Sequence, residues 1–384
     1  MSVEAAFAAA LARLLPAELP PRLAVAVSGG ADSTALALLA QDYCTRRGGA
    51  VQALIVDHGL RAEARQEARL TAARLAARGI ESRVITLALA AGPGMQARAR
   101  EARHAALAAA AQDAGWLYLA LGHHQADQHE TVAMRARRGP GGAEGMAGWS
   151  ARSKLVLLRP LLEIPPAALR DFLRARAMEW VEDPSNQARA FERVRIRLDG
   201  AGLPPADAAA RMAREEEAAA FLARHARLYP EGYAVLEAGA APVAALGALI
   251  RTIGGRLYSP RQEALLSLAA ALRPATLGGV RIAPAGRLGP GWLLAREPAA
   301  CAPPVLARSH ALWDGRFTLT APAPGAVSFG ALGDDAAGFQ GFNALPSLVL
   351  RGLPALRDAQ GATVFPAPSL FTPPLPATAR PFQA

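Results

Sequence analysis

The sequence predicts an α/β fold that begins with a doubly wound parallel sheet and continues into a helical region and a small β-rich end. Short apolar runs alternate with helical segments over the first 200 residues, residues 204–272 keep helical spacing, and residues 273–384 are rich in proline and glycine. Alternating strands and helices form parallel sheets with helices on both faces. We therefore expect three domains, at residues 1–200, 201–272 and 273–384, the last ending in a proline-rich tail.

Each element of the first domain follows from its spacing. The amino-terminal stretch predicts a surface helix that ends at Pro16, Pro20 and Pro21. Apolar runs predict five strands, at Leu23–Val27, Val51–Arg61, Ser82–Leu89, Trp116–His124 and Lys154–Leu162. Helices are expected from Ala35 onward and at Ala62–Arg78, Gln96–Ala114 and Gln125–Arg137. The glycine-rich stretch Arg138–Ser153 predicts a flexible loop, and Pro366–Ala384 predict a poorly ordered or surface-lying tail.

Composition favours a nucleic-acid partner. The net charge is +10, and Lys154 is the only lysine, so arginine carries nearly all the positive charge. Arginine binds phosphate through a planar fork and stacks on bases, although a biased genome would produce the same excess. Cys44 and Cys301 form no disulfide framework or zinc cluster, which favours a reducing cytoplasm. No apolar run is long enough to span a bilayer, so we expect no membrane partner.

The turn after the first strand predicts an anion site. In "AVAVSGGADSTALALLA", a buried strand meets a helix through two glycines, with hydroxyls on either side. Glycines permit a close backbone approach, and the N–H groups at a helix start attract phosphate. The string is neither a Walker loop nor a dinucleotide fingerprint. A capped strand-to-helix turn without a ligand is the alternative.

A second group of polar residues follows the fourth strand. "ALGHHQADQHET" contains His123, His124, Asp127, His129 and Glu130 at a strand–helix junction. Metal binding is one interpretation, because Asp127 and Glu130 lie on adjacent helical positions. Another is that the acids only complement the helix N-terminus. Because parallel strands end at one edge of a sheet, Ser28, Asp57 and His123 should face the same crevice.

These motifs resemble a known family. Ser-Gly-Gly-x-Asp-Ser resembles the PP-loop of ATP pyrophosphatases, and "GHHQADQHET" is similar to the corresponding motif of tRNA(Ile)-lysidine synthetases. "VDHGLR", "GMQARAREARHAAL" and "RPLLEIPPAALRDFLRARAMEWVEDPSNQARAFERVRIR" resemble further elements of that family in the same order. Departures are Ala126 for the first acid of an Asp-Asp pair, His104 for an aromatic residue, and a divergent glycine-rich loop.

The resemblance implies an enzyme and a substrate set. The family uses ATP to join L-lysine to C2 of the wobble cytidine of tRNA(Ile) with a CAU anticodon, forming lysidine through an adenylated base and releasing AMP and pyrophosphate. Alternatives are another PP-loop tRNA-modifying enzyme or a non-catalytic RNA-binding relative. The oligomeric state stays open, with a dimer as one option.

The resemblance also implies roles for individual residues. ATP would bind Ser28, Gly29, Gly30, Ala31, Asp32 and Ser33, with Mg²⁺ near Asp32. Catalysis would involve Asp32, His123, His124, Asp127 and Glu130, with the division of labour among Asp127, Glu130 and the histidines open. Arg61, Arg100, Arg103, Arg193 and Arg197 would contact tRNA or phosphate, although a solvated basic helix face would account equally well for Arg98, Arg100 and Arg103.

Overall fold

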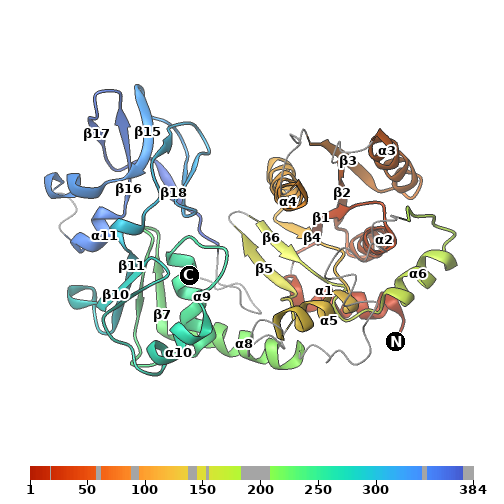
Figure 1. The fold of residues 1–384 in the computed structure, drawn as a ribbon, viewed down its shortest axis with the longest axis horizontal. Helices are drawn as coiled ribbons and strands as arrows, with labels where there is room; N and C mark the ends of the chain where they lie inside the picture. The colour runs from red at the N-terminus through yellow and green to blue at the C-terminus, as the bar shows by residue number, and fades with distance from the viewer. Residues whose placement is uncertain are drawn as a thin grey trace. The chain divides into compact units, whose positions relative to one another are not determined.

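The computed structural model describes residues 1–17, 19–57, 62–87, 95–136, 145–152, 155–182, 208–339 and 344–374. The chain forms two compact units, one of Met1–Ser150 with Leu155–Arg211 and one of Ala151–Lys154 with Met212–Ala384. Figure 1 shows the helices and strands of both units. The three-domain division remains a prediction.

A six-stranded sheet forms the centre of the first unit, in the order β3-β2-β1-β4-β6-β5. The strands are β1 (Arg22–Val27), β2 (Ala50–Asp57), β3 (Glu81–Thr86), β4 (Tyr118–Ala120), β5 (Trp149–Arg152) and β6 (Leu155–Leu158). β1 pairs in parallel with both β2 and β4, so Val25 lies between Ala53 and Ala120. The carboxyl ends of these three strands therefore meet at one edge, as the sequence predicted.

Helices cover both faces of this sheet, which confirms the doubly wound fold. They are α1 (Val3–Leu14), α2 (Ala31–Thr45), α3 (Ala62–Ala76), α4 (Met95–Asp113), α5 (Gln125–Ala136) and α6 (Pro166–Ala175). Figure 1 shows α4 on one face and α2 and α3 on the other. Leu107 and Ala111 of α4 pack with Ala24 and Ala26 of β1. The amino-terminal helix α1 is present, with Ser2 as its N-cap.

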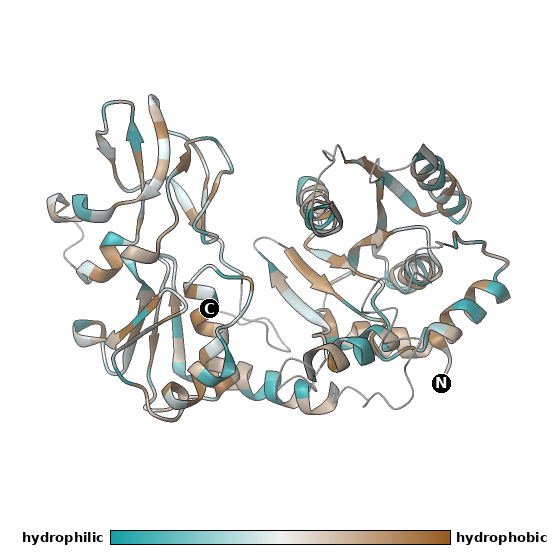
Figure 2. Ribbon diagram, viewed as in Figure 1, coloured by the Kyte–Doolittle hydropathy of each residue, from teal (hydrophilic) through white to brown (hydrophobic). Residues whose placement is uncertain are grey.

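One strand of the first sheet was not predicted. β5 lies inside the stretch Arg138–Ser153, which the sequence placed wholly in a loop. Trp149 and Ala151 are buried while Ser150 and Arg152 are partly exposed, so the strand alternates over only four residues. An alternation this short carries little signal beside many glycines. By contrast, all four residues of β6 are apolar and buried, and Figure 2 shows this strand in brown.

The second unit is mainly antiparallel. Its largest sheet has the order β7-β8-β11-β10-β9, and two smaller sheets have the orders β12-β15-β16-β17 and β13-β14-β18. The strands are β7 (Ala226–Tyr229), β8 (Tyr233–Leu236), β9 (Ala275–Leu277), β10 (Val280–Pro284), β11 (Trp292–Arg296), β12 (Val305–Leu306), β13 (Leu312–Trp313), β14 (Phe317–Leu319), β15 (Ala326–Ala331), β16 (Pro354–Asp358), β17 (Thr363–Val364) and β18 (Ser369–Phe371). The helices are α8 (Ala208–His225), α9 (Val243–Ile253), α10 (Gln262–Ala270) and α11 (Ser347–Arg351), with 3-10 turns at Gly286–Leu288, Pro298–Ala300 and Gly333–Gly338.

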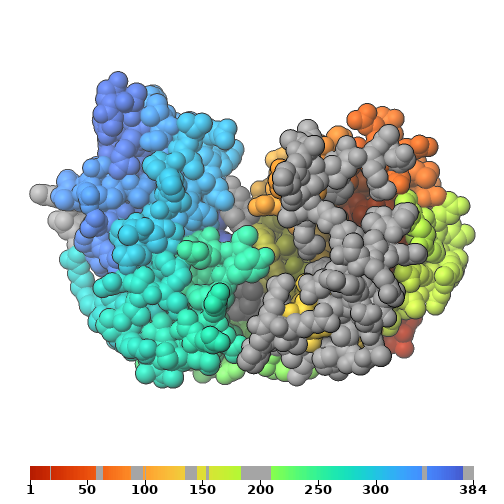
Figure 3. All heavy atoms as spheres, viewed as in Figure 1, coloured from red at the N-terminus to blue at the C-terminus, as the bar shows by residue number. Residues whose placement is uncertain are grey.

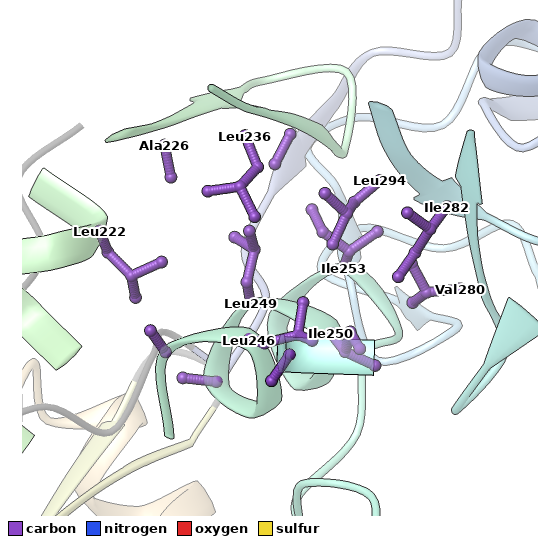
Figure 4. Packing of buried hydrophobic residues seen from close by; sticks show 14 of the residues in the cluster. Leu222, Ala226, Leu236, Leu246, Leu249, Ile250, Ile253, Val280, Ile282 and Leu294 are labelled. Carbon is purple, nitrogen blue, oxygen red and sulfur yellow. The ribbon is translucent and has the colours of Figure 1, made fainter. Parts of the chain in front are cut away.

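The main core of the second unit lies between α9 and its largest sheet. Leu246, Leu249, Ile250 and Ile253 of α9 point toward Leu236, Ile282 and Leu294 of the strands, as Figure 4 shows. Residues before and after position 272 thus contribute to the same core. In Figure 3 the atoms of residues 212–339, green through light blue, pack against one another.

One prediction for the second unit was wrong in part. Residues 204–272 were expected to keep helical spacing, but β7 and β8 form a hairpin within them. The tail was predicted to be poorly ordered or to lie on the surface, and its described part follows the second alternative, because Ser369–Phe371 pair with β14 and Leu370 is 59% exposed. In both cases the strands are four residues or fewer, and strand neighbours stabilise them. Among the described helices, none combines the length and apolar character needed to cross a membrane.

Candidate active site

The turn Ser28–Ser33, which we call the glycine turn, joins β1 to α2 and is held by its own hydroxyls. Ser33 Oγ accepts the Ser28 N–H at 3.1 Å and lies within hydrogen-bonding distance of Gly30 O at 3.1 Å. Gly30 is the N-cap of α2 and has no side chain to occupy the first N–H groups of that helix. The N–H groups at a helix start attract anions. The turn therefore has the shape and polarity that the sequence predicted for phosphate.

Gly29 is required by both its conformation and its neighbours. Its φ is +86°, and a Cβ there would lie 2.7 Å from Thr71 Oγ1 of α3. Its carbonyl accepts the Val181 N–H at 2.9 Å. Thr71 and Val181 thus pack over the turn from two other segments, and any side chain at position 29 would displace them.

Gly122 brings the end of β4 against the start of α2. A Cβ on Gly122 would lie 3.3 Å from the backbone N of Ser33. This close approach places the next residues, His123 and His124, beside the glycine turn. His124 is buried, and its backbone bridges to Leu161 after β6. Its ring therefore occupies a fixed position at the edge of the sheet.

Asp32, His124 and Asp127 form what we call the acid–imidazole cluster. His124 Nε2 lies 3.3 Å from Asp32 Oδ2, and His124 Nδ1 lies 3.5 Å from Asp127 Oδ2. Asp127 also accepts the His124 backbone N–H at 3.0 Å. The side-chain exposure is 34% for Asp32, 15% for Asp127 and 7% for His124. One imidazole thus lies between two carboxylates, and its cationic form would be paired on both sides.

One oxygen of this cluster is available to a ligand. Asp32 Oδ1 is buried and has no hydrogen-bond partner among the residues that the structure describes. A buried carboxylate oxygen without a donor is costly unless a cation or a proton reaches it. This atom lies in the first turn of α2, next to the predicted phosphate position. It is the structural observation that supports a cation at this point.

Magnesium fits the cluster only with help from a phosphate ligand. No group of three or more metal-binding side chains occurs in the described ranges. Magnesium is nevertheless commonly held by one or two carboxylates together with water and substrate phosphates. Asp32 Oδ1 can supply one such oxygen. The donor set is therefore compatible with magnesium that arrives with a nucleotide.

Asp127 lies on α5 with the other acidic and amide residues of its motif. Glu130 is 2% exposed and His123 is partly buried. Gln128 is buried, and its side chain donates to Met146 O at 3.0 Å, so it ties α5 to the described part of the glycine-rich stretch. Ala126, where the related motif has an acid, lies in the first turn of α5 and is partly exposed. Asp127 is thus an acid of the motif that contacts His124 directly.

A pocket of about 270 Å³ lies on the other side of the glycine turn, at the ends of β1 and β2. Ser28 and Gly30 line it beside apolar residues of β2 and α3. Arg103 and Leu107, one turn apart on α4, form another wall, and Val181 contributes from the segment after α6. Pockets outside the carboxyl ends of parallel strands are where such sheets bind ligands. Its apolar walls and its basic group suit a nucleoside attached to phosphate.

The structure brings together most of the predicted residues that it describes. Ser28–Ser33, His124 and Asp127 meet at the glycine turn, and Arg103 lines the pocket. Arg100 lies on α4, and its side chain falls outside the part of the chain that the structure describes. Arg61, Arg193 and Arg197 lie outside the described residues. Asp57 is buried with Arg65 Nε 3.8 Å away.

The sequence prediction missed one wall of the site. Ala64, Glu67 and Ala68 of α3 line the pocket, and Thr71 packs on Gly29. These four residues follow helical spacing along one face of α3. The helical spacing of these residues could be seen in the sequence, but no motif near them indicated that this face of α3 packs on the glycine turn. Likewise, no sequence motif indicated that Val181 lines the pocket.

Comparison with known proteins agrees with this geometry. The PP-loop domain family matches residues 3–199. The tRNA(Ile)-lysidine synthase of Hyphomonas neptunium is 39% identical over 307 residues, which cover 73% of this chain and 83% of that protein. That of Rhizobium meliloti is 36% identical over 383 residues, covering 90% and 82%. That of Ruegeria pomeroyi is 38% identical over 334 residues, covering 80% and 78%.

The match to the Rhizobium meliloti protein covers 90% of this chain and therefore extends into both compact units. The predicted fold, the PP-loop and the assignment to an ATP-using ligase are thereby confirmed. With the glycine turn, the acid–imidazole cluster and relatives that match most of its length, the chain belongs to the tRNA(Ile)-lysidine synthase family of PP-loop proteins.

Proposed function

We propose that this protein ligates L-lysine to C2 of the wobble cytidine of tRNA(Ile) with a CAU anticodon, using ATP and releasing AMP and pyrophosphate. The observation that carries the proposal is the placement of the acid–imidazole cluster on the β4 side of the glycine turn, with the pocket on its β2 side. A nucleotide bound across the turn would have its base in the pocket and its phosphates beside Asp32. The names of the relatives support tRNA(Ile) as the substrate.

The first step is adenylation of the base. The C2 carbonyl oxygen of cytidine attacks the α-phosphorus of ATP, and the bond from that phosphorus to the β-phosphate bridging oxygen breaks. Negative charge grows on the departing pyrophosphate, so donors fixed before the reaction lower the barrier. The N–H groups of the glycine turn would supply them. Magnesium, when bound at Asp32, would offset the charge of the phosphates.

The second step transfers lysine. The neutral ε-amine attacks C2, the C2–O bond breaks, and AMP leaves with the oxygen. The amine of free lysine has a pKa near 10.4, so a base must hold the ammonium and take up a proton. We assign this role to Asp127, because its carboxylate is mostly buried and contacts His124. His124 would orient both carboxylates of the cluster, with Glu130 and His123 supporting it.

The thiolation reaction carried out by other PP-loop enzymes finds no support in the cysteines. Burial raises the pKa of Cys44 to about 12, and burial also raises that of Cys301. A cysteine nucleophile needs a lowered pKa. Cys44 and Cys301 also belong to different compact units. A paired-cysteine mechanism therefore does not fit this chain.

The direct test is incubation with ATP, lysine and a tRNA transcript carrying a CAU anticodon. We expect nucleoside mass spectrometry to detect lysidine, with pyrophosphate release that depends on both lysine and tRNA. A transcript with a CAU-to-GAU anticodon change is the control and should remain unmodified. ATP-dependent modification of a different nucleotide would contradict the proposal, and so would tRNA binding without pyrophosphate release.

A further inference from the structure

The loop between α9 and α10 presents apolar side chains to solvent. This α9–α10 loop, Gly254–Arg261, exposes Tyr258 by 75% and Leu257 by 50%. The loop itself is anchored: the Arg256 N–H donates to Arg251 O at 3.0 Å, and Arg256 Nε donates to Gly278 O at 2.9 Å. Gly255 has a φ of +63° where the chain leaves α9. Tyr258 is therefore held outward by an ordered loop.

Arginine predominates over acidic residues in the sequence on either side of this tyrosine. Between residues 251 and 287 the only acidic residue is Glu263, whereas the arginines are Arg251, Arg256, Arg261, Arg273, Arg281 and Arg287. All of these arginines except Arg251 are exposed. An exposed aromatic ring between arginines is the composition that binds single-stranded nucleic acid, since bases stack on the ring and phosphates pair with the guanidinium groups.

We propose that the α9–α10 loop is a contact for unpaired RNA, in which Tyr258 stacks on a base and Arg256 and Arg261 bind the flanking phosphates. The identity of that RNA as tRNA rests on the proposed function. The excess of arginine over acid matches a polyanion, and the outward tyrosine selects a strand whose bases are not already stacked in a duplex. The loop would add affinity and would take no part in the chemistry.

The test is binding of three RNAs, namely the tRNA transcript, a short single strand and a duplex of the same length. Tyr258→Ala should weaken binding of the tRNA and the single strand by about 5- to 100-fold and leave the duplex unchanged. Tyr258→Phe should stay within about twofold of the parent, because the ring is retained. Arg261→Ala should reduce the slope of log affinity against log salt by about 0.7–0.9, whereas Tyr258→Ala should not change it.

Matched controls are available on the same unit. Leu306 is 69% exposed and Arg308 is exposed, and both lie outside the arginine-rich stretch. Leu306→Ala and Arg308→Ala should bind all three RNAs like the parent. If Tyr258→Ala binds like the controls, or weakens the duplex as much as the single strand, the inference is wrong. If Tyr258→Ala binds RNA like the parent while the parent protein forms lysidine, only the inference is overturned. If Tyr258→Ala binds single-stranded RNA more weakly but the parent protein forms no lysidine, only the proposed function is overturned.

Discussion

Two ionic clusters of this protein, one in each compact unit, differ in how completely their charges are paired. In the first unit, Asp32 is 34% exposed and one of its oxygens has no donor among the described residues. In the second unit, Asp314 is 3% exposed and lies between Arg296 and Arg316, each 2.8 Å away. Asp314 also accepts the Ala302 N–H at 3.0 Å. The first cluster leaves oxygen for a ligand, whereas the second is satisfied by protein alone.

This difference in charge pairing distinguishes a cluster suited to binding a ligand from a cluster suited to stabilising the fold. A charge that is fully enclosed by opposite charges and N–H groups stabilises one local arrangement and offers nothing to a substrate. A carboxylate that is only partly satisfied costs free energy in the absence of a ligand and is typical of binding sites. Substitution in the acid–imidazole cluster should therefore change activity more than stability, and substitution at Asp314 should do the reverse.

The largest expected effect is on adenylation. Asp32→Ala should reduce tRNA-dependent pyrophosphate release by roughly 10³-fold or more, because the phosphates lose the carboxylate that would hold their cation. Binding of tRNA should remain, and the melting temperature should change little. Asp42→Asn is the matched control, since Asp42 lies on the same helix with similar exposure but is paired with Arg176 at 2.6 Å. Loss of tRNA binding together with adenylation would instead indicate a folding role for Asp32.

The second effect is on stability. Asp314→Asn would leave two buried guanidinium groups facing each other, and burial already lowers the pKa of Arg316. Removing one partner of such a group costs about 3–5 kcal/mol. Asp334→Asn is the control, because Asp334 is 92% exposed in its pair with Arg351 and should contribute about 1 kcal/mol or less. Denaturant unfolding measures the free energy of unfolding of both variants. Equal decreases in the two variants would show that burial does not determine how much these ion pairs contribute.

The third effect separates the two chemical steps. Asp127→Asn keeps the shape and the acceptor for the His124 N–H but removes the charge. We expect adenylated tRNA to accumulate while lysine transfer slows by about 10²–10³-fold. The measurement traps radiolabelled AMP on tRNA and then adds lysine. Glu130→Gln should be less affected. If adenylation fails and transfer from preformed adenylate is normal, Asp127 serves the phosphates instead.

The smallest expected effect is a pH-dependent change in the free energy of unfolding. The Thr363 hydroxyl and then Arg357 hold the pKa of Asp335 below its ordinary value of 3.8. A lowered folded-state pKa stabilises the protein above the unfolded-state value, and this stabilisation disappears as pH falls through the folded-state value. Asp335→Asn should therefore cost about 1 kcal/mol or less near neutral pH and nothing in strong acid. Thr363→Val should show the same trend. A difference that persists at low pH would contradict this explanation.

Much of the first unit could be predicted because its signals are local. Leu23–Val27 form a buried strand, two glycines end it, and Ala31–Thr45 form a helix, all within one short stretch. The long helices α3, α4 and α5 were likewise predicted to within a few residues. Three strands of four residues, β5, β7 and β8, were missed because their patterns were too short to overcome the glycine-rich or helical signals around them.

The residues of the candidate site were predicted as two separate motifs, the glycine turn and the polar group after the fourth strand. The residue types in each motif indicated which kind of ligand group it could bind. Glycines, hydroxyls and helix N–H groups indicate phosphate wherever they occur after a buried strand. Order in the chain also placed both motifs at strand ends, since parallel strands share one carboxyl edge. Sequence therefore determined the fold class, the family and the types of group that lie at the candidate site.

Only the tertiary structure decided which of these groups touch. Pairing of β1 with β4, and the close approach of Gly122 to Ser33, place His124 3.3 Å from Asp32, although 91 residues separate them in the chain. The packing of α3 sets Thr71 over Gly29 and adds Glu67 to the pocket. The enclosure of Asp314 by two arginines likewise depends on how strands and loops of the second unit close around it. Such contacts arise when segments that are distant in the sequence pack together, and a local sequence pattern does not show which distant segment it will meet.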